Sequence, residues 1–345
     1  MCLGSAIHST CKQAGYKPAE GLGSDSVITT GAEIELSVVV AVLTYRRPDM
    51  LGKLLAEYAS MSRPAHARIS LVVIDNDELG SAEEVVNSWR DRIGDAVYVL
   101  EKRRGIPVAR NRAIDEALAQ RADALCFIDD DEYPDKQWIV NLIDCWKTTG
   151  AQLVGGPVVV APPPEGATTW QRMINASLAS RQERKNRGVM NAVTEGRRYT
   201  IVTNNWLCDL KWLTRTGIRF NENMLVTGGS DTEFYRNARR HFCVAAWCPQ
   251  AVVFETMGYE RLSLAYHFKR GAYQSMANFQ IKTPQVRPSM ILPTMLVAAL
   301  RALLGGLLLV VPVLGKASPV MAVRSLGWAV GRTMAIFGKS SKLYK

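Results

Sequence analysis

The decisive stretch is Leu125-Cys126-Phe127-Ile128-Asp129-Asp130-Asp131-Glu132, in which four apolar residues end abruptly in four carboxylates. Such a short apolar run is typical of a buried strand. Adjacent carboxylates repel one another unless a cation lies among them, and Mg²⁺ and Mn²⁺ prefer oxygen ligands. The stretch therefore favours a metal and phosphate site at a strand tip. The alternative is an acidic surface turn that caps the following helix.

Strands and helices are predicted to alternate on both sides of this stretch. The alternation indicates an α/β fold with a doubly wound, mostly parallel sheet. No Gly-rich dinucleotide loop or Walker loop is present, so the usual dinucleotide-binding and P-loop classes are excluded. The predicted strands are 36–43, 69–74, 96–100, 125–128 and 153–160. The predicted helices are 48–58, 81–92, one that begins at Pro107, and 138–146. Ser81 and Glu84 are expected to form a capping box at the start of the second helix.

Polar side chains follow three of these strands. Thr44 follows the first, Asp75 to Asp77 follow the second, and Asp129 to Asp131 follow the fourth. Ligands of open α/β sheets bind outside the carboxyl ends of the strands. We therefore expect these side chains to line a nucleotide crevice.

The composition is that of a globular protein with an anionic partner. The chain has 345 residues, is 48% hydrophobic and has a formal net charge of +10. That charge suits nucleotide phosphate, nucleic acid or anionic lipid. No nucleic-acid-binding signature is present, so we expect no nucleic acid partner. The seven cysteines are scattered and odd in number, which predicts free thiols.

Three segments are expected: a flexible leader at 1–36, a main domain at 37–282, and membrane-associating helices at 283–345. Within the main domain the polar, basic stretch 180–200 has two equally weighted interpretations, a functional basic segment or a solvated loop. The apolar run 290–314 is long enough to span a bilayer. Arg301 would then lie mid-membrane, at a cost of a few kcal/mol, which helices lying in the interface avoid. The alternative is a buried helical pair of the soluble domain.

Five motifs together resemble family 2 glycosyltransferases of the GT-A type, with bacterial exopolysaccharide transferases of the succinoglycan kind the most similar group. The resemblance covers about residues 37–270. It rests on Val38-Val-Val-Ala-Val-Leu-Thr-Tyr-Arg-Arg-Pro48, Val72-Val-Ile-Asp-Asn-Asp77, Gly105-Ile-Pro-Val-Ala-Arg-Asn-Arg112, Phe127-Ile-Asp-Asp-Asp-Glu132 and the GGED-like Gly228-Gly-Ser-Asp-Thr-Glu-Phe234.

The resemblance implies inverting, metal-dependent transfer of a sugar from a nucleotide-sugar donor. Residues 37–160 would form the nucleotide-sugar half and 161–282 the acceptor half. By this resemblance Asp129 and Asp131 would hold Mg²⁺ or Mn²⁺, and Asp231 would be the catalytic base. The residues implied to bind the nucleotide are Thr44, Asp75, Asn76, Asp77, Arg110 and Asp129. The candidates for acceptor or diphosphate contacts are Asn205, Trp206, Glu233, His267 and Arg270. For His267, a purely structural role is the favoured alternative.

Two positions depart from the family pattern. Asn76 stands where many members carry a second Asp, and Ser230 replaces the usual Glu before Asp231. The first departure leaves the donor nucleotide open, and the second leaves the acceptor open.

The expected acceptor is a hydroxyl of a polysaccharide, lipopolysaccharide or lipid-linked oligosaccharide. The expected location is the cytoplasmic face of the bacterial inner membrane, bound to an anionic lipid surface or integral through 290–314. Two alternatives remain: a nucleotidyltransferase with a similar sheet, and a non-catalytic nucleotide-sugar-binding subunit.

Overall fold

The computed structural model describes residues 36–224, 229–283, 286–310 and 318–339. The expected leader, apart from Leu36, lies outside the described residues, as do Gly228 and the end of the 290–314 run.

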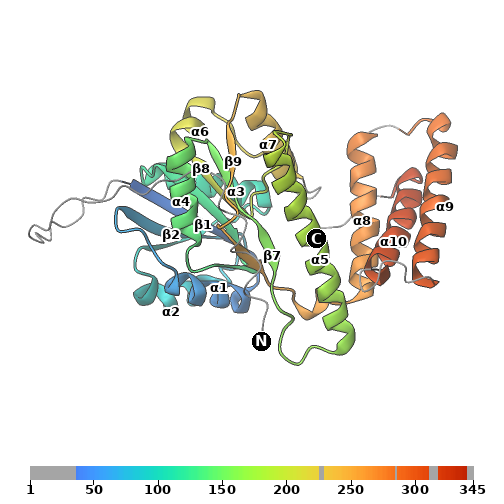
Figure 1. The fold of residues 1–345 in the computed structure, drawn as a ribbon, viewed down its shortest axis with the longest axis horizontal. Coiled ribbons are helices and arrows are strands. Elements are labelled where there is room, and N and C mark those ends of the chain that lie inside the picture. The colour runs from blue at the N-terminus through green and yellow to red at the C-terminus, as the bar shows by residue number, and fades with distance from the viewer. Residues whose placement is uncertain (1–35, 225–228, 284–285, 311–317, 340–345) are drawn as a thin grey trace, which may run out of the picture. The chain divides into compact units, whose positions relative to one another are not determined.

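The centre of the fold is a seven-stranded sheet with a three-stranded sheet beside it (Figure 1). In the large sheet β1, β2, β3 and β4 run parallel, whereas β8 is antiparallel to both of its neighbours. The predicted doubly wound, mostly parallel sheet is therefore confirmed. The strand order of the large sheet is β3 (Ala96–Leu100), β2 (Ala67–Asp75), β1 (Leu36–Thr44), β4 (Ala124–Asp129), β8 (Asn205–Asp209), β6 (Leu153–Gly155) and β9 (Ala245–Trp247). The strand order of the small sheet is β5 (Glu132–Pro134), β10 (Val253–Glu255) and β7 (Val158–Val160).

Helices cover both faces of the large sheet, because its central strands are apolar on both sides. In β1, Val38, Val40 and Val42 point into one core, and Val39 and Ala41 point into the other. Successive side chains of a strand alternate between faces, so an unbroken apolar strand needs a layer on each. The first core contains α1 (Pro48–Ser60), α2 (Glu83–Ile93) and α4 (Trp138–Thr149), and the second contains α3 (Ile106–Ala119), α6 (Leu210–Thr216) and α7 (Ser230–Arg240).

The single strand predicted at 153–160 is wrong. Gly156-Pro157 divides it into β6 and β7, which join different sheets. A Cβ on Gly156 would lie 2.1 Å from the carbonyl oxygen of Ala251, so only glycine fits there. Pro157 cannot donate to a sheet ladder, which supports the break.

Two local predictions about helices are also wrong. Residues 180–200 are not a loop over most of their length, because α5 (Thr169–Thr194) runs through them. A capping box of Thr168 and Gln171 begins this helix, and its second half is polar because most of it is exposed. The capping box predicted at Ser81 does not form, since α2 begins after Ala82 with no side-chain cap.

Three helices complete the described chain: α8 (Leu264–Lys282), α9 (Pro288–Val310) and α10 (Ser318–Ile336). In Figure 1 they lie together beside α5. One described segment, Pro288–Leu309, is long and apolar enough to cross a membrane. The helix α10 packs closely on α8, where a Cβ on Gly331 would lie 2.0 Å from the carbonyl oxygen of Ala272. Gly327 and Gly331 therefore form the small-residue contact that lets helix backbones approach.

Gly331→Ala is expected to lower the free energy of unfolding by about 1–3 kcal/mol, because the added methyl group overpacks the α8–α10 contact. Gly306→Ala is the matched control, since a Cβ there has no neighbour within 4 Å. The control gains the same helix propensity, about 1 kcal/mol, without a clash. Thermal unfolding in detergent measures both. A Gly331→Ala protein as stable as the control would contradict this packing.

Candidate functional site

The register of the parallel strands brings the predicted polar residues to one edge of the sheet. Thr44 pairs with Asp75 across β1 and β2, and Leu43 pairs with Asp129 across β1 and β4. The predicted gathering of Thr44, Asp75 and Asp129 at neighbouring strand tips is therefore confirmed.

The four carboxylates after β4 lie in a network of charged contacts. The hydroxyl of Thr44 donates to Asp130 Oδ2 over 2.9 Å. Arg47 Nη1 lies 3.0 Å from Asp130 Oδ1 and 3.2 Å from Asp131 Oδ2. Arg261 Nη2 lies 2.7 Å from the same oxygen of Asp131. These residues form a cluster of charged contacts rather than the helix cap of the alternative interpretation, because β5 follows the turn directly.

Negative charge exceeds positive charge at this cluster. Burial, and then the charge of Asp131, raises the pKa of Asp129 to about 7. Burial, and then the charge of Asp129, raises the pKa of Glu132 well above its ordinary value. Burial likewise raises the pKa of Asp130 and of Glu255. A bound cation would lower all four, because it stabilises the ionised forms.

The donor set fits a hard divalent cation only in part. No group of three or more His, Cys, Asp or Glu side chains in the described part of the chain has the arrangement of a metal site. Mg²⁺ is usually held by one or two carboxylates together with substrate phosphates. Asp129 and Asp131 would supply these two carboxylates, and the donor phosphates would supply the remaining ligands.

The residues after β2 are held by their own loop. Asp75 is buried and accepts hydrogen bonds from the amides of Asp77 and Ala82 and from the hydroxyl of Tyr98. Asp77 accepts from Arg46 over 3.2 Å.

Asn76 connects this loop to the one after β3. Its amide nitrogen donates to the carbonyls of Glu101 and Arg103, and its amide oxygen accepts from Gly105. Asn76 therefore fixes the two loops that flank the expected base pocket.

A third part of the site begins at α7. Gly229 has a left-handed backbone with a φ of 86°, which suits the tight turn predicted there. Asp231 and Glu233 lie in the first turn of α7, and both are half-buried. Arg110 Nη1 lies 3.2 Å from the hydroxyl of Ser230, and its charge lowers the pKa of Asp129. Arg110 therefore lies between the strand-tip carboxylates and the start of α7.

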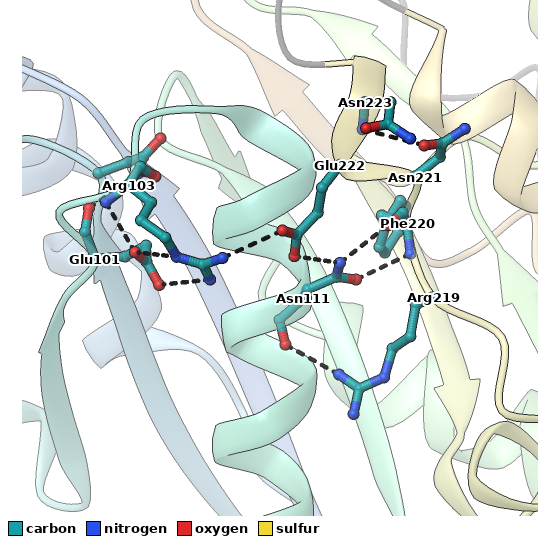
Figure 2. Close-up of polar contacts among 9 residues, drawn as sticks. Glu101, Arg103, Asn111, Arg219, Phe220, Asn221, Glu222 and Asn223 are labelled. Carbon is teal, nitrogen blue, oxygen red and sulfur yellow. Dashed lines mark hydrogen bonds and ion pairs between the residues drawn. The ribbon is translucent and has the colours of Figure 1, made fainter.

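The segment before α7 is anchored on α3, as Figure 2 shows. Asn111 Oδ1 accepts from the amide of Phe220, and Asn111 Nδ2 donates to the carbonyl of Phe220 and to Glu222 Oε1, each over 2.9 Å. Arg103 Nη1 lies 3.2 Å from Glu222 Oε2. Arg219 donates to the carbonyl of Asn111. These contacts fix the 219–223 segment against the loop after β3.

Two candidates for acceptor contact lie in the core. The amide of Asn205 accepts from Trp138 Nε1 and donates to the carbonyls of Pro157 and Ala251. Trp206 is buried and stacks on Phe127. The neighbouring Asn204 reaches the site instead, and donates to Glu132 Oε1 over 2.6 Å.

His267 and Arg270 both lie on α8. His267 is buried, and neither ring nitrogen has a hydrogen-bond partner among the described residues. Burial, and then the charge of Arg324, lowers the pKa of His267 to about 4, so its ring is neutral at physiological pH. Arg270 donates to the hydroxyl of Tyr266.

The positive side of the cluster, formed by Arg47 and Arg261, does not follow from the local sequence. Arg47 lies in the loop before α1, and its pairing with Asp130 and Asp131 depends on the turn after β4. Arg261 and Glu255 come close to Asp131 only because β10 pairs with β5, with Glu255 opposite Glu132. Nothing in the local sequence around Arg261 indicates this contact.

Comparisons with known proteins agree with this architecture. Residues 39–213 match the family described as Glycosyl transferase family 2. The succinoglycan biosynthesis protein ExoM of Rhizobium meliloti is 32% identical over 236 residues, which cover 68% of this chain and 72% of that protein. The crystal structure of Staphylococcus aureus TarS 1–349 in complex with UDP-GlcNAc is 13% identical, with a TM-score of 0.50, and the match covers 86% of this chain and 90% of that one. The last similarity shows a shared fold.

Proposed function

The chain belongs to glycosyl transferase family 2 and is a glycosyltransferase, and on that premise we propose that it catalyses inverting, metal-dependent transfer of a sugar from a nucleotide-diphosphate sugar to a glycan or lipid-linked hydroxyl. The observation that carries this proposal is the position of Arg110 between Asp129 and the start of α7. It supports a site in which the proposed donor side and the start of α7, which carries Asp231, lie close together.

Asp231 is proposed as the general base. Transfer to a hydroxyl requires removal of its proton as the anomeric carbon is attacked. The helix α7 starts on the far side of Arg110 from the strand-tip carboxylates, which suits a base that approaches the sugar opposite its leaving group. Glu233 is the alternative base on the same helical turn.

The leaving diphosphate gathers negative charge that must be stabilised. A Mg²⁺ or Mn²⁺ ion bound at Asp129 and Asp131 would supply Lewis-acid stabilisation of that charge. Arg47 and Arg261 add positive charge at the same carboxylate. Thr44, Asp75, Asn76 and Asp77 are proposed to shape the nucleoside pocket, with Asn76 acting through the two loops that it joins. His267 and Arg270 remain candidates for diphosphate contacts.

The acceptor is proposed to be a growing exopolysaccharide or its lipid-linked precursor, because the ExoM relative is named for succinoglycan biosynthesis. Residues 37–160 are proposed as the donor half and 161–282 as the acceptor half. Asn205 and Trp206 would then support the crevice from the core, since both are buried.

Membrane association is proposed to occur through α9. Its leucine stripe, defined as Leu292, Leu296, Leu300, Leu303 and Leu307, follows helical spacing and is 58–72% exposed. An exposed apolar face of this length marks a membrane or protein contact. The proposed location is the cytoplasmic face of the inner membrane, on an anionic lipid surface.

The decisive experiment follows the products of a labelled donor in membranes with Mn²⁺. A glycosyltransferase releases a nucleoside diphosphate and transfers the label to a glycan, and inversion appears as a changed anomeric configuration by NMR. A nucleotidyltransferase would instead need added pyrophosphate, and would convert the donor into a nucleoside triphosphate and a sugar 1-phosphate. Donor binding without either product would indicate a binding subunit.

A further inference from the structure

A second cluster of charge lies away from the carboxylates, in a cavity of about 340 Å³ between α5, α8, α9 and α10. Its volume is near the lower end of small-ligand sites, about 300–1,000 Å³. No Asp or Glu lines it. We call it the arginine cavity, because it is lined by Arg181 and Arg184 of α5, Arg301 of α9 and Arg324 of α10.

Two carboxylates on the elements around the arginine cavity pair with other arginines. Glu183 of α5 lies within ion-pair distance of Arg187, and Glu255 lies 3.2 Å from Arg261. No carboxylate in the described part of the chain is found within ion-pair distance of the four cavity arginines. Their positive charge is therefore not compensated by any described carboxylate.

The cavity arginines repel one another. Burial, and then the charges of Arg181 and Arg270, lowers the pKa of Arg324 to about 10. Burial, and then the charges of Arg270 and Arg184, also lowers the pKa of Arg181. Arg324 is half-buried, whereas Arg181, Arg184 and Arg301 are exposed. Like charges gathered at one site destabilise it unless an anion joins them. The cavity is therefore built to gain from a multiply charged anion.

The rest of the lining suits a ligand with a polar head and an apolar body. Gln274 and Asn278 of α8 supply hydrogen-bonding groups, while Leu304 of α9 and Met321 of α10 supply apolar surface. Arg301 is stacked on Trp328, with its guanidinium carbon 4.2 Å from the ring centroid. That contact turns the arginine of the most apolar helix toward the cavity.

We propose that the arginine cavity binds the phosphate groups of an anionic lipid headgroup, whose chains leave along the apolar surface of α9. Arginine matches phosphate oxygens with several donors in a fixed fork. Two lipids share this chemistry: a bulk anionic phospholipid and a polyprenyl diphosphate that carries the acceptor. The inference rests on the proposed membrane association of α9 and not on the transfer chemistry.

The test compares two double variants of the full-length protein by vesicle co-sedimentation. Arg181→Gln with Arg324→Gln removes two charges from the cavity. Arg187→Gln with Arg198→Gln removes two exposed charges from the same region of the chain, outside the cavity lining. A diffuse electrostatic attraction to the membrane depends only on the number of charges, and each arginine contributes about fivefold in affinity for the vesicle. It would therefore weaken both variants equally.

The expected result is that the wild type prefers vesicles of phosphatidylcholine with phosphatidylglycerol over pure phosphatidylcholine. The cavity variant should lose this preference by at least about tenfold more than the control variant. Binding to pure phosphatidylcholine should stay the same in all three proteins. Equal losses in the two variants, or no loss in the cavity variant, would overturn the proposal.

Two further measurements identify the ligand and distinguish failure of the cavity site from failure of the membrane association. Phosphatidylcholine vesicles that contain a polyprenyl diphosphate, at charge matched to phosphatidylglycerol, show which lipid the cavity prefers. Soluble pyrophosphate should raise the unfolding temperature of the wild type in detergent more than that of the cavity variant, in which the proposed diphosphate site near Asp131 is intact. If no protein binds any vesicle, only the proposed membrane association fails. Pyrophosphate stabilisation that is undiminished in the cavity variant would overturn the proposed cavity site.

Discussion

Asp231→Asn is expected to lower kcat by at least about 10²- to 10⁴-fold, the range that positioned acid–base groups contribute. Asparagine keeps the shape and hydrogen bonding of the side chain but cannot take a proton from the acceptor. The affinity for the donor should change little, because the interaction is made in the transition state. Single-turnover rates and donor binding, measured on the same preparation, separate the two quantities.

Glu233→Gln is the matched comparison, because Glu233 lies on the same first turn of α7 and is also half-buried. Residues two apart on a helix point in different directions, so only one of the two carboxylates can face the sugar. Near-normal turnover in Asp231→Asn together with collapse in Glu233→Gln would move the base to Glu233. Near-normal turnover in both would remove this helix start from the chemistry.

The strand-tip part of the site could be predicted because it depends on local pattern alone. Buried parallel strands are unbroken apolar runs, and each ends where polar residues begin, so the positions of Thr44, Asp75 and Asp129 follow from the sequence. Their gathering follows from the parallel arrangement and needs no further information. The same pattern does not indicate a role for Arg261, because its contact with Asp131 requires the pairing of β10 with β5.

The polar residues on β8 show why composition alone misplaces a site. Asn205 suggests a surface or a ligand contact, but its amide satisfies Trp138 Nε1 and two carbonyls inside the core. A buried indole and buried carbonyls require such a partner. An isolated sequence does not distinguish this need from a functional one.

Two features of the structure have a visible signal in the sequence. Gly156-Pro157 interrupts the run 153–160, and proline in the middle of a predicted strand argues against one continuous strand. The spacing of Gly327 and Gly331 is that of a close helix contact, which the structure forms between α10 and α8. By contrast, the polar half of α5 carries only a weak apolar periodicity, because little of it is buried.

The metal-free protein is expected to lose stability as the pH rises from 5 to 8. Asp129 has a folded-state pKa of about 7, raised first by burial and then by Asp131, whereas an unfolded Asp has a pKa of about 3.9. Between these values the folded state binds more protons than the unfolded state, so the free energy of unfolding falls with pH. The raised pKa values of Glu132 and Glu255 act in the same direction, whereas the lowered pKa of His267 acts in the opposite direction below about pH 6.5. The loss from the carboxylates alone should be on the order of 2–4 kcal/mol, and the net loss should be clearest between about pH 6.5 and 8.

Asp129→Asn should remove much of this loss, because it deletes one titrating group and one cause of the raised pKa of Glu132. Asp91→Asn, on the exposed face of α2, is the control and should keep the wild-type profile.

Thermal unfolding across the pH range, with and without Mn²⁺, measures the effect. In the wild type, Mn²⁺ should stabilise more strongly at pH 8 than at pH 6, because protons compete for the same carboxylate. In Asp129→Asn the Mn²⁺ effect should be small at both pH values. A wild-type stability that rises between about pH 6.5 and 8 would show that Asp129 is not the titrating group. An Asp129→Asn protein that keeps the full Mn²⁺ effect would show that Asp129 is not a ligand of the cation.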